Sequence, residues 1–223
     1  MFRGLVFKEL REIWWLGLLP LAVMIHVTFR EAGRDLLSGA VRDLNYWQKM
    51  PFADSQVAYT ALQCGCLLAA AMGLWQTFRE SQGHTWHFLL HRPANRQAIL
   101  GAKLAAAATV YLLSVVMPAL CLALWAATAG MHPSPFAWSL TDTTWYAAAA
   151  GTTLYLAGLF AGLRRGRLYG SRMWPLLGAG VLFGIGTVAI PYNYLAWMWT
   201  VLLLWDLLFA FAVRDELLAA DFN

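Results

Sequence analysis

Three histidines near the middle of the chain have the residue type and spacing that could bind a metal. His84, His87 and His91 are separated by three and four residues, so a helix would place them on one face. Three imidazoles on one face could bind zinc or another borderline metal. No Asp, Glu or Cys completes the set, and Pro93 follows closely, so interfacial polar residues are the favoured interpretation and no metal site is predicted. An intramembrane metal-dependent enzyme using these histidines, with or without Asp206, is kept as an alternative hypothesis.

Motifs of known catalytic chemistry are missing from the sequence. It has no G-x-S-x-G elbow, no H-E-x-x-H pair and no phosphate-binding G-K-[ST] loop. The glycine run GAGVLFGIG is similar to a nucleotide-binding pattern, but Phe183 occupies the position of the third glycine and no strand flanks it. The chain is therefore not predicted to be an enzyme by itself. If it works by ATP, the ATPase is a separate chain.

Asp206 is the one acidic residue well inside a predicted membrane span. A carboxylate in a membrane is costly unless it is paired or hydrated, so it is a functional hypothesis by default. Asp206 precedes Arg214 by eight residues, or roughly 12 Å of helix, which places it nearer the cytoplasmic interface than the midplane. We favour a structural role, in which Asp206 bonds a neighbouring helix, over a proton or substrate role.

Two pairs of glycines have the spacing that lets membrane helices approach closely. They are Gly158 with Gly162, and Gly180 with Gly184. We interpret both pairs as packing devices at a helix–helix or subunit interface.

The composition determines the fold class that must position these residues. Of 223 residues, 60% are hydrophobic and 13% charged, and mean hydropathy is +0.54. A soluble domain of this length does not need so much apolar sequence. About 20 apolar residues cross the hydrocarbon core as a helix. The sequence therefore predicts an all-α polytopic membrane protein, a single transmembrane domain over 1–223, with spans at 13–29, 57–78, 101–128, 144–163, 174–190 and 195–213.

The placement of Lys and Arg predicts the orientation of these spans. With both termini inside, twelve of the 16 cations fall on the cytoplasmic side and four fall in the long outer loop 30–56. The predicted location is the cytoplasmic (inner) membrane. The cytoplasmic set is Arg3, Lys8, Arg11, Arg79, Arg92, Arg96, Lys103, Arg164, Arg165, Arg167, Arg172 and Arg214, and the outer set is Arg30, Arg34, Arg42 and Lys49.

Two amphipathic segments are expected at the membrane surfaces. Residues 2–12 mix apolar and charged side chains, which suits a short helix along the inner interface, or alternatively an extension of the first span with snorkelling charges. In the outer loop, Leu36, Leu37, Val41 and Leu44 recur at helical spacing and predict a helix on the outer surface.

A polar segment, 79–103, separates the second and third predicted spans. Trp86, Phe88, Leu89 and Leu90 form an apolar cluster in it that ends at Arg92. Pro93 breaks the helix, and Asn95 can cap a new one that re-enters the membrane. The pattern predicts a cytoplasmic helix between these spans, and the alternative is a simple connecting loop.

The layout and this segment together resemble the membrane-spanning permease subunits of ATP-binding cassette (ABC) transporters of the type-2 exporter family. The basic amphipathic start FKELRE, the six spans and the large first outer loop carry the layout. His84 separates Gly83 from Thr85, which interrupts the Gly-Thr pair common in that family. The motif is carried by Glu80, Gly83, Thr85, Leu89, Leu90, Pro93, Arg96 and Lys103.

The resemblance implies a function driven by a partner protein. The segment around 83–92 would be a coupling helix seated in a groove of a cytoplasmic ATPase, which would hold the ATP and Mg²⁺. A second permease subunit, identical or different, would complete the transporter, with export as the expected direction; no nucleic-acid partner is expected. A non-enzymatic membrane scaffold is the third hypothesis. The implied contact residues are Gly83, Thr85, Trp86, Phe88, Leu89 and Leu90, with Glu80, Arg92 and Arg96 as polar flanks.

Overall fold

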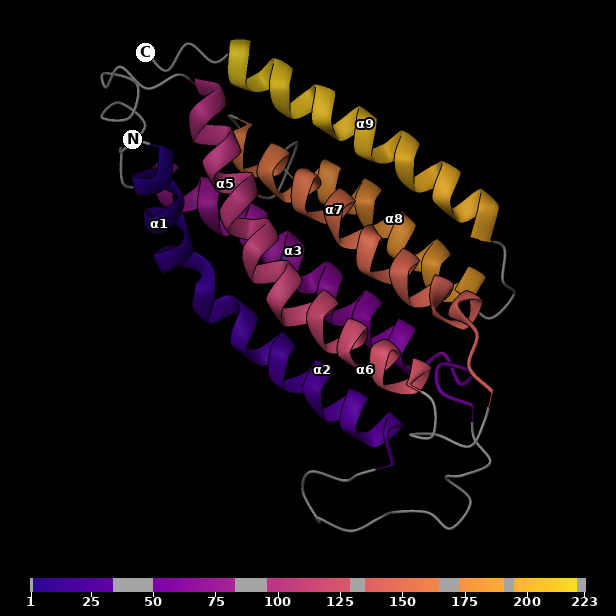
Figure 1. Cartoon of the computed structure of the whole chain (residues 1–223). Helices are drawn as coiled ribbons and strands as arrows, with labels where there is room; N and C mark the ends of the chain where they lie inside the picture. Colours follow the sequence, from indigo (N-terminus) through magenta and orange to yellow (C-terminus); the bar gives the residue numbers. More distant parts are fainter. Residues whose placement is uncertain are drawn as a thin grey trace.

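The protein is a bundle of long helices. The computed structural model describes residues 2–33, 50–82, 96–128, 135–164, 173–190 and 195–219, and every regular element within these ranges is helical. The long helices run side by side along one direction (Figure 1). The predicted all-helical fold is thus confirmed for the part of the chain that the structure describes.

The helices follow the predicted apolar runs closely. Two pairs of consecutive helices are joined by short irregular turns. A 3₁₀ turn at Trp14–Gly17 joins α1 to α2, and a π-helical turn at Leu112–Val116 joins α5 to α6. A further 3₁₀ turn at Trp138–Thr141 leads into α7. The elements are α1 (Phe2–Ile13), α2 (Leu18–Glu31), α3 (Gln56–Gln82), α5 (Arg96–Tyr111), α6 (Met117–Ala127), α7 (Asp142–Leu163), α8 (Trp174–Ala189) and α9 (Leu195–Ala219).

Five described helical segments are long and apolar enough to cross a membrane. They are Phe2–Glu31, Gln56–Arg79, Gln97–Ala127, Trp138–Leu163 and Ala196–Glu216. The remaining predicted span, the fifth (174–190), coincides with α8, whose apolar stretch Trp174–Val188 is shorter than those five. The count of six spans therefore stays a prediction.

Two sequence predictions concern segments outside the described residues. These are the outer-surface helix with Leu36, Leu37, Val41 and Leu44, and the cytoplasmic helix at 83–92. Both stay predictions.

The core of the bundle is the contact between α3 and α7, which is the most extensive contact between two described helices. A methyl group added at Gly158 would lie 2.8 Å from the carbonyl oxygen of Ala70 and 3.3 Å from the Cα of Gly73. Gly73 and Gly158 therefore face each other, and neither position has room for a side chain. Because Gly162 likewise faces Thr77, one turn further along both helices, α3 and α7 run in the same direction.

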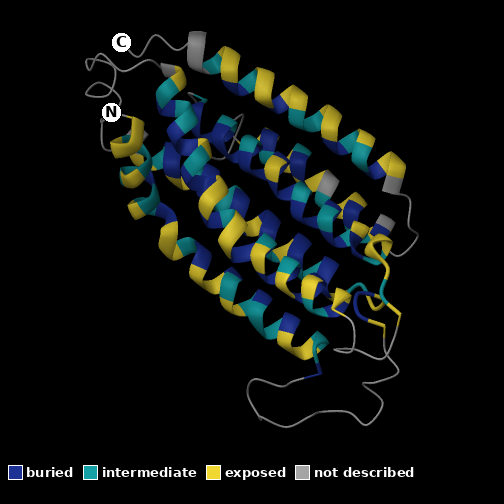
Figure 2. Cartoon of the chain, viewed as in Figure 1, coloured by how far each residue is buried: buried dark blue, intermediate teal, exposed yellow. Residues whose placement is uncertain are grey.

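The outside of the bundle is apolar, as the surface of a membrane protein must be. Leu203, Leu204, Leu207 and Phe211 on α9 are all more than half exposed. Figure 2 shows α9 and α2 with exposed outer faces, whereas α7 is largely buried. Since lipid is as apolar as leucine, such faces are stable against acyl chains and unstable in water.

The two irregular turns lie against each other. A methyl group at Gly17 would lie 2.5 Å from Ser114 Oγ and 2.7 Å from Val110 Cγ1, so the 3₁₀ turn after α1 packs on the π turn after α5. Residues 2–12 were expected to form either a distinct helix or an extension of the first span. In the structure they belong to α1, which ends at Ile13. The chain changes direction there before α2 begins (Figure 1).

Alanine substitution of the facing glycine tests the core contact. We expect Gly158→Ala to lower the free energy of unfolding by about 1–3 kcal/mol. The added methyl group would meet backbone atoms of α3, which cannot move aside as a flexible side chain can. Chemical unfolding of the detergent-solubilised protein, followed by circular dichroism, measures it.

Gly101→Ala on α5 is the matched control, because its added methyl group would meet only Phe2 Cε2 at 3.6 Å, an ordinary van der Waals contact. It makes the same change in helix propensity in another apolar helix. Equal stability of the two variants would show that α3 and α7 do not approach closely at Gly158.

Candidate functional site

The residues predicted to contact an ATPase lie mostly outside the described part of the chain. Gly83, Thr85, Trp86, Phe88, Leu89, Leu90 and Arg92 belong to this group, as do His84, His87 and His91. Glu80 lies in the last turn of α3 and Arg96 is the first residue of α5. The structure therefore describes the two helices that border the predicted coupling segment, and a polar site lies between them.

Lys103 is the charged centre of this site. It lies two turns into α5, and its side chain is only 3% exposed. Its Nζ lies 3.0 Å from Oε1 of Glu9 on α1, whose side chain is also 3% exposed. Lys103, one of the twelve cations counted on the cytoplasmic side, is therefore buried and paired rather than exposed. The predicted orientation stays a prediction.

Gln76 on α3 joins α3 to α5 through a reciprocal pair of bonds. Lys103 Nζ donates to the backbone carbonyl of Gln76 at 3.1 Å, and Gln76 Nε2 donates to the backbone carbonyl of Lys103 at 3.3 Å. Each side chain thus bonds the other residue's main chain. The two helices are held together near the ends that border the coupling segment.

Tyr155 extends the site to α7. Its hydroxyl donates to Oε1 of Gln76 at 2.8 Å, and the Gln76 side chain is fully buried. We name these four residues, Glu9, Gln76, Lys103 and Tyr155, the Lys103 network. It links one residue from each of α1, α3, α5 and α7.

The Lys103 network satisfies an electrostatic requirement. A single buried charge in a low-dielectric environment is costly, whereas an ion pair with further hydrogen bonds offsets much of that cost. Glu9 and Lys103 carry opposite charges, and Gln76 supplies an acceptor for a second ammonium proton. Lys8 adds a weaker contact to Glu9 at 3.7 Å from a partly exposed position. The arrangement is suited to fixing helices in place.

Sequence reasoning did not find this network. Gln76 interrupts the second apolar run and Lys103 the third, and a polar side chain inside a span is the signal that could have indicated a buried site. The partners are 94 residues apart for Lys103 and Glu9, and 79 for Tyr155 and Gln76. No local pattern shows which polar residues meet across such separations.

Asp206 contacts a neighbouring helix. Its two carboxylate oxygens accept hydrogen bonds from the hydroxyls of Thr152 at 2.7 Å and Thr153 at 2.5 Å, both on α7. The ring of Trp205, next to it on α9, packs on Phe209. The carboxylate thus attaches α9, most of whose surface is exposed, to the buried core helix.

The predicted glycine pairs differ in their surroundings. Gly158 and Gly162 lie against α3, as described above, whereas a methyl group at Gly180 or Gly184 would meet nothing within 4 Å. Gly180 and Gly184 therefore do not pack two described helices of this chain together. The subunit interface expected as the alternative for this pair stays a prediction.

Metal chemistry finds no support in the described part of the chain. Within it, no three His, Cys, Asp or Glu side chains are arranged to hold a metal ion. The histidine hypothesis concerns residues outside that part and stays a hypothesis.

The fold and the surface define a helical protein of the membrane-spanning class. Comparison of the chain with models of protein families, with curated proteins and with solved structures found no match. The assignment to a transporter family is therefore a proposal that rests on the sequence pattern and on the geometry.

A double-mutant cycle tests the ion pair of the Lys103 network. We expect Lys103→Met to lower the free energy of unfolding by about 3–5 kcal/mol, because it leaves the Glu9 carboxylate buried without its counter-ion. Glu9→Met combined with Lys103→Met should cost much less than the sum of the single changes. Lys8→Met is the control and should cost under about 1 kcal/mol, since that contact is longer and partly exposed. Additive effects of Glu9→Met and Lys103→Met would contradict the pairing.

A second cycle tests the attachment of α9. Thr153→Val should cost about 1 kcal/mol in detergent unfolding, which is typical of a hydrogen bond between membrane helices. In an Asp206→Ala background the same change should cost almost nothing. Thr109→Val is the control, because its hydroxyl bonds only the carbonyl of Ala105 in its own helix. An unchanged cost of Thr153→Val in the Asp206→Ala background would rule out the contact.

Proposed function

We propose that this chain is the membrane-spanning subunit of an ABC transporter, an exporter driven by a separate cytoplasmic ATPase. In this proposal the segment 83–92 is the coupling helix, the membrane is the cytoplasmic one, and both termini lie in the cytoplasm. The likeness of Glu80, Gly83, Leu89, Leu90 and Arg96 to the family's pattern supports it, as does the absence of an ATP-binding loop from the sequence.

The observation that carries the proposal is the position of the Lys103 network beside this segment. Gln76 lies six residues before the end of α3, and Lys103 lies seven residues after the start of α5. These separations correspond to roughly 9–11 Å of helix. The bonds between Gln76 and Lys103 hold the two bordering helices together, while Glu9 and Tyr155 tie them to α1 and α7. A force on the segment would therefore be transmitted to four helices at once.

Transport requires more than a rigid connection. An ATPase can move the permease only if its ATP-bound state binds the two permease conformations with different free energies. A helix seated in a groove of the ATPase provides such a difference, because its contacts depend on the distance between the two ATPases. In the proposed mechanism, α3 and α5 would move together with the coupling helix, because the bonds between Gln76 and Lys103 join them.

Two features support the proposed six spans and orientation. The described chain starts and ends at the same end of the bundle, as an even number of crossings requires (Figure 1). The helix α8 is apolar over Trp174–Val188 and would be the short fifth span, which brings the count to six.

In this proposal, the second permease subunit contacts α8. Gly180 and Gly184 have open space beside them, and Val181 and Ile185 next to them are exposed. Small residues beside exposed apolar ones let a second helix approach closely.

Charge substitution in the coupling segment tests the proposal. The Leu89→Glu/Leu90→Glu variant should no longer co-purify with an ATPase that contains a phosphate-binding loop, because two carboxylates would be buried in an apolar groove. Co-purification from the native membrane, with mass spectrometry of the captured chains, measures it.

The control is Leu36→Glu/Leu37→Glu, the same change at another leucine pair in the predicted outer loop. It should leave the ATPase bound, and both variants should unfold at the same denaturant concentration as the wild type. An ATPase that stays bound to the Leu89→Glu/Leu90→Glu variant would show that this segment is not the coupling helix. A wild-type chain that captures no ATPase would contradict the transporter itself.

A further inference from the structure

The exposed side of α1 forms a groove that the proposed transport function does not explain. It is lined by Gly4, Phe7, Lys8, Leu10, Arg11 and Trp14 and has a volume of about 620 Å³. This volume lies within the range of small-molecule binding sites. We call it the α1 groove.

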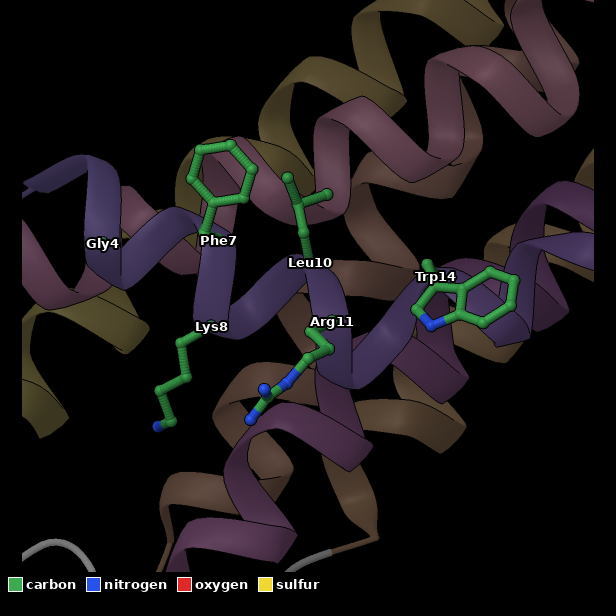
Figure 3. Close-up of a pocket in the computed structure, with 6 residues that line it drawn as sticks. All are labelled: Gly4, Phe7, Lys8, Leu10, Arg11 and Trp14. Atoms are coloured by element: carbon green, nitrogen blue, oxygen red, sulfur yellow. The ribbon is translucent and has the colours of Figure 1, made fainter.

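The α1 groove has one cationic and one apolar side. Lys8 and Arg11 extend along one edge of this face of α1, and Phe7 and Leu10 extend along the other edge (Figure 3). Gly4, one turn before Lys8, has no atom within 4 Å of an added methyl group, so the groove is open there. An occupant must therefore combine an anionic group with an apolar one.

The two cations favour a phosphate. Arg11 is exposed, and its planar guanidinium can donate two parallel hydrogen bonds to phosphate oxygens. Lys8 lies one turn away and adds a second positive charge. Its Nζ also lies 3.7 Å from Oε1 of Glu9. The same Glu9 oxygen lies closer to Nζ of Lys103, at 3.0 Å, so Glu9 is mainly the counter-ion of the buried Lys103.

The aromatic side favours acyl chains. Phe7 is 74% exposed and Trp14 is 54% exposed, which is costly in water but favourable at a membrane boundary. The four-residue turn Trp14–Gly17 connects α1 directly to the apolar helix α2, so α1 lies where a membrane-crossing helix ends. From these observations we infer that the α1 groove binds an anionic phospholipid of the membrane, with its phosphate on Lys8 and Arg11 and its acyl chains along Phe7 and Trp14. Such binding does not depend on the transport function.

Lipid titration of the full chain tests the inference. Native mass spectrometry of the detergent-solubilised protein should show a tightly bound phosphatidylglycerol, and phosphatidylcholine should bind more weakly. Lys8→Gln/Arg11→Gln should weaken phosphatidylglycerol binding by about tenfold or more and leave phosphatidylcholine binding unchanged. Lys8→Arg/Arg11→Lys, which keeps both charges, should bind nearly as well as the wild type.

Two controls distinguish a lipid site in the α1 groove from a general attraction of anions to the basic surface. Arg79→Gln/Arg214→Gln removes two exposed cations elsewhere on the bundle and should keep the tight binding. Soluble glycerol 3-phosphate should not displace the lipid. Equal losses in both double-Gln variants, binding of phosphatidylcholine as tight as that of phosphatidylglycerol, or displacement by glycerol 3-phosphate would each overturn the inference. Unfolding in phosphatidylcholine alone checks that every variant is folded.

Discussion

The close approach of α3 and α7 is the constraint on which the rest of the structure depends. Gly73 and Gly158 let the two backbones meet without intervening side chains. This approach brings Gln76, three residues after Gly73, to within 2.8 Å of Tyr155, three residues before Gly158. A side chain at either glycine would meet backbone atoms of the other helix and push the two helices apart. The packing of small residues therefore determines where polar groups can be satisfied.

The polar contacts follow from that geometry and from the cost of charge in an apolar environment. Once Gln76 is held by Tyr155, its backbone carbonyl and its amide nitrogen are in position for Lys103 on α5. The ammonium then needs a counter-charge, which Glu9 on α1 supplies. On α9 the Asp206 carboxylate is instead satisfied by two threonine hydroxyls. Both sites hold peripheral helices against the α3–α7 core.

The sequence predicted the elements of the fold far better than their contacts. The runs 57–78 and 144–163 differ by only a few residues from α3 and α7, because a long apolar run in helical register has few other stable structures. Spacing also indicated that Gly158 and Gly162 pack helices, yet the same spacing at Gly180 and Gly184 faces open space. A small-residue motif describes one helix surface and carries no information on the surface opposite. The pairing of Lys103 with Glu9 escaped prediction for a related reason: the two residues are 94 positions apart in the sequence.

The position of the Lys103 network has a consequence for how the proposed coupling helix would act. If α3 and α5 were joined only by the segment between them, a displacement of that segment could be absorbed by bending either helix alone. The reciprocal bonds of Gln76 and Lys103 oppose such bending, because separating the helices would break two hydrogen bonds and expose a buried ion pair. The less costly motion is a joint displacement of both helices with α1. At the junction of α1 and α2 and at that of α5 and α6, regular helix gives way to a 3₁₀ and a π turn, respectively. Such turns often mark the points where helices bend, so the joint motion would pivot where Gly17 packs on Ser114.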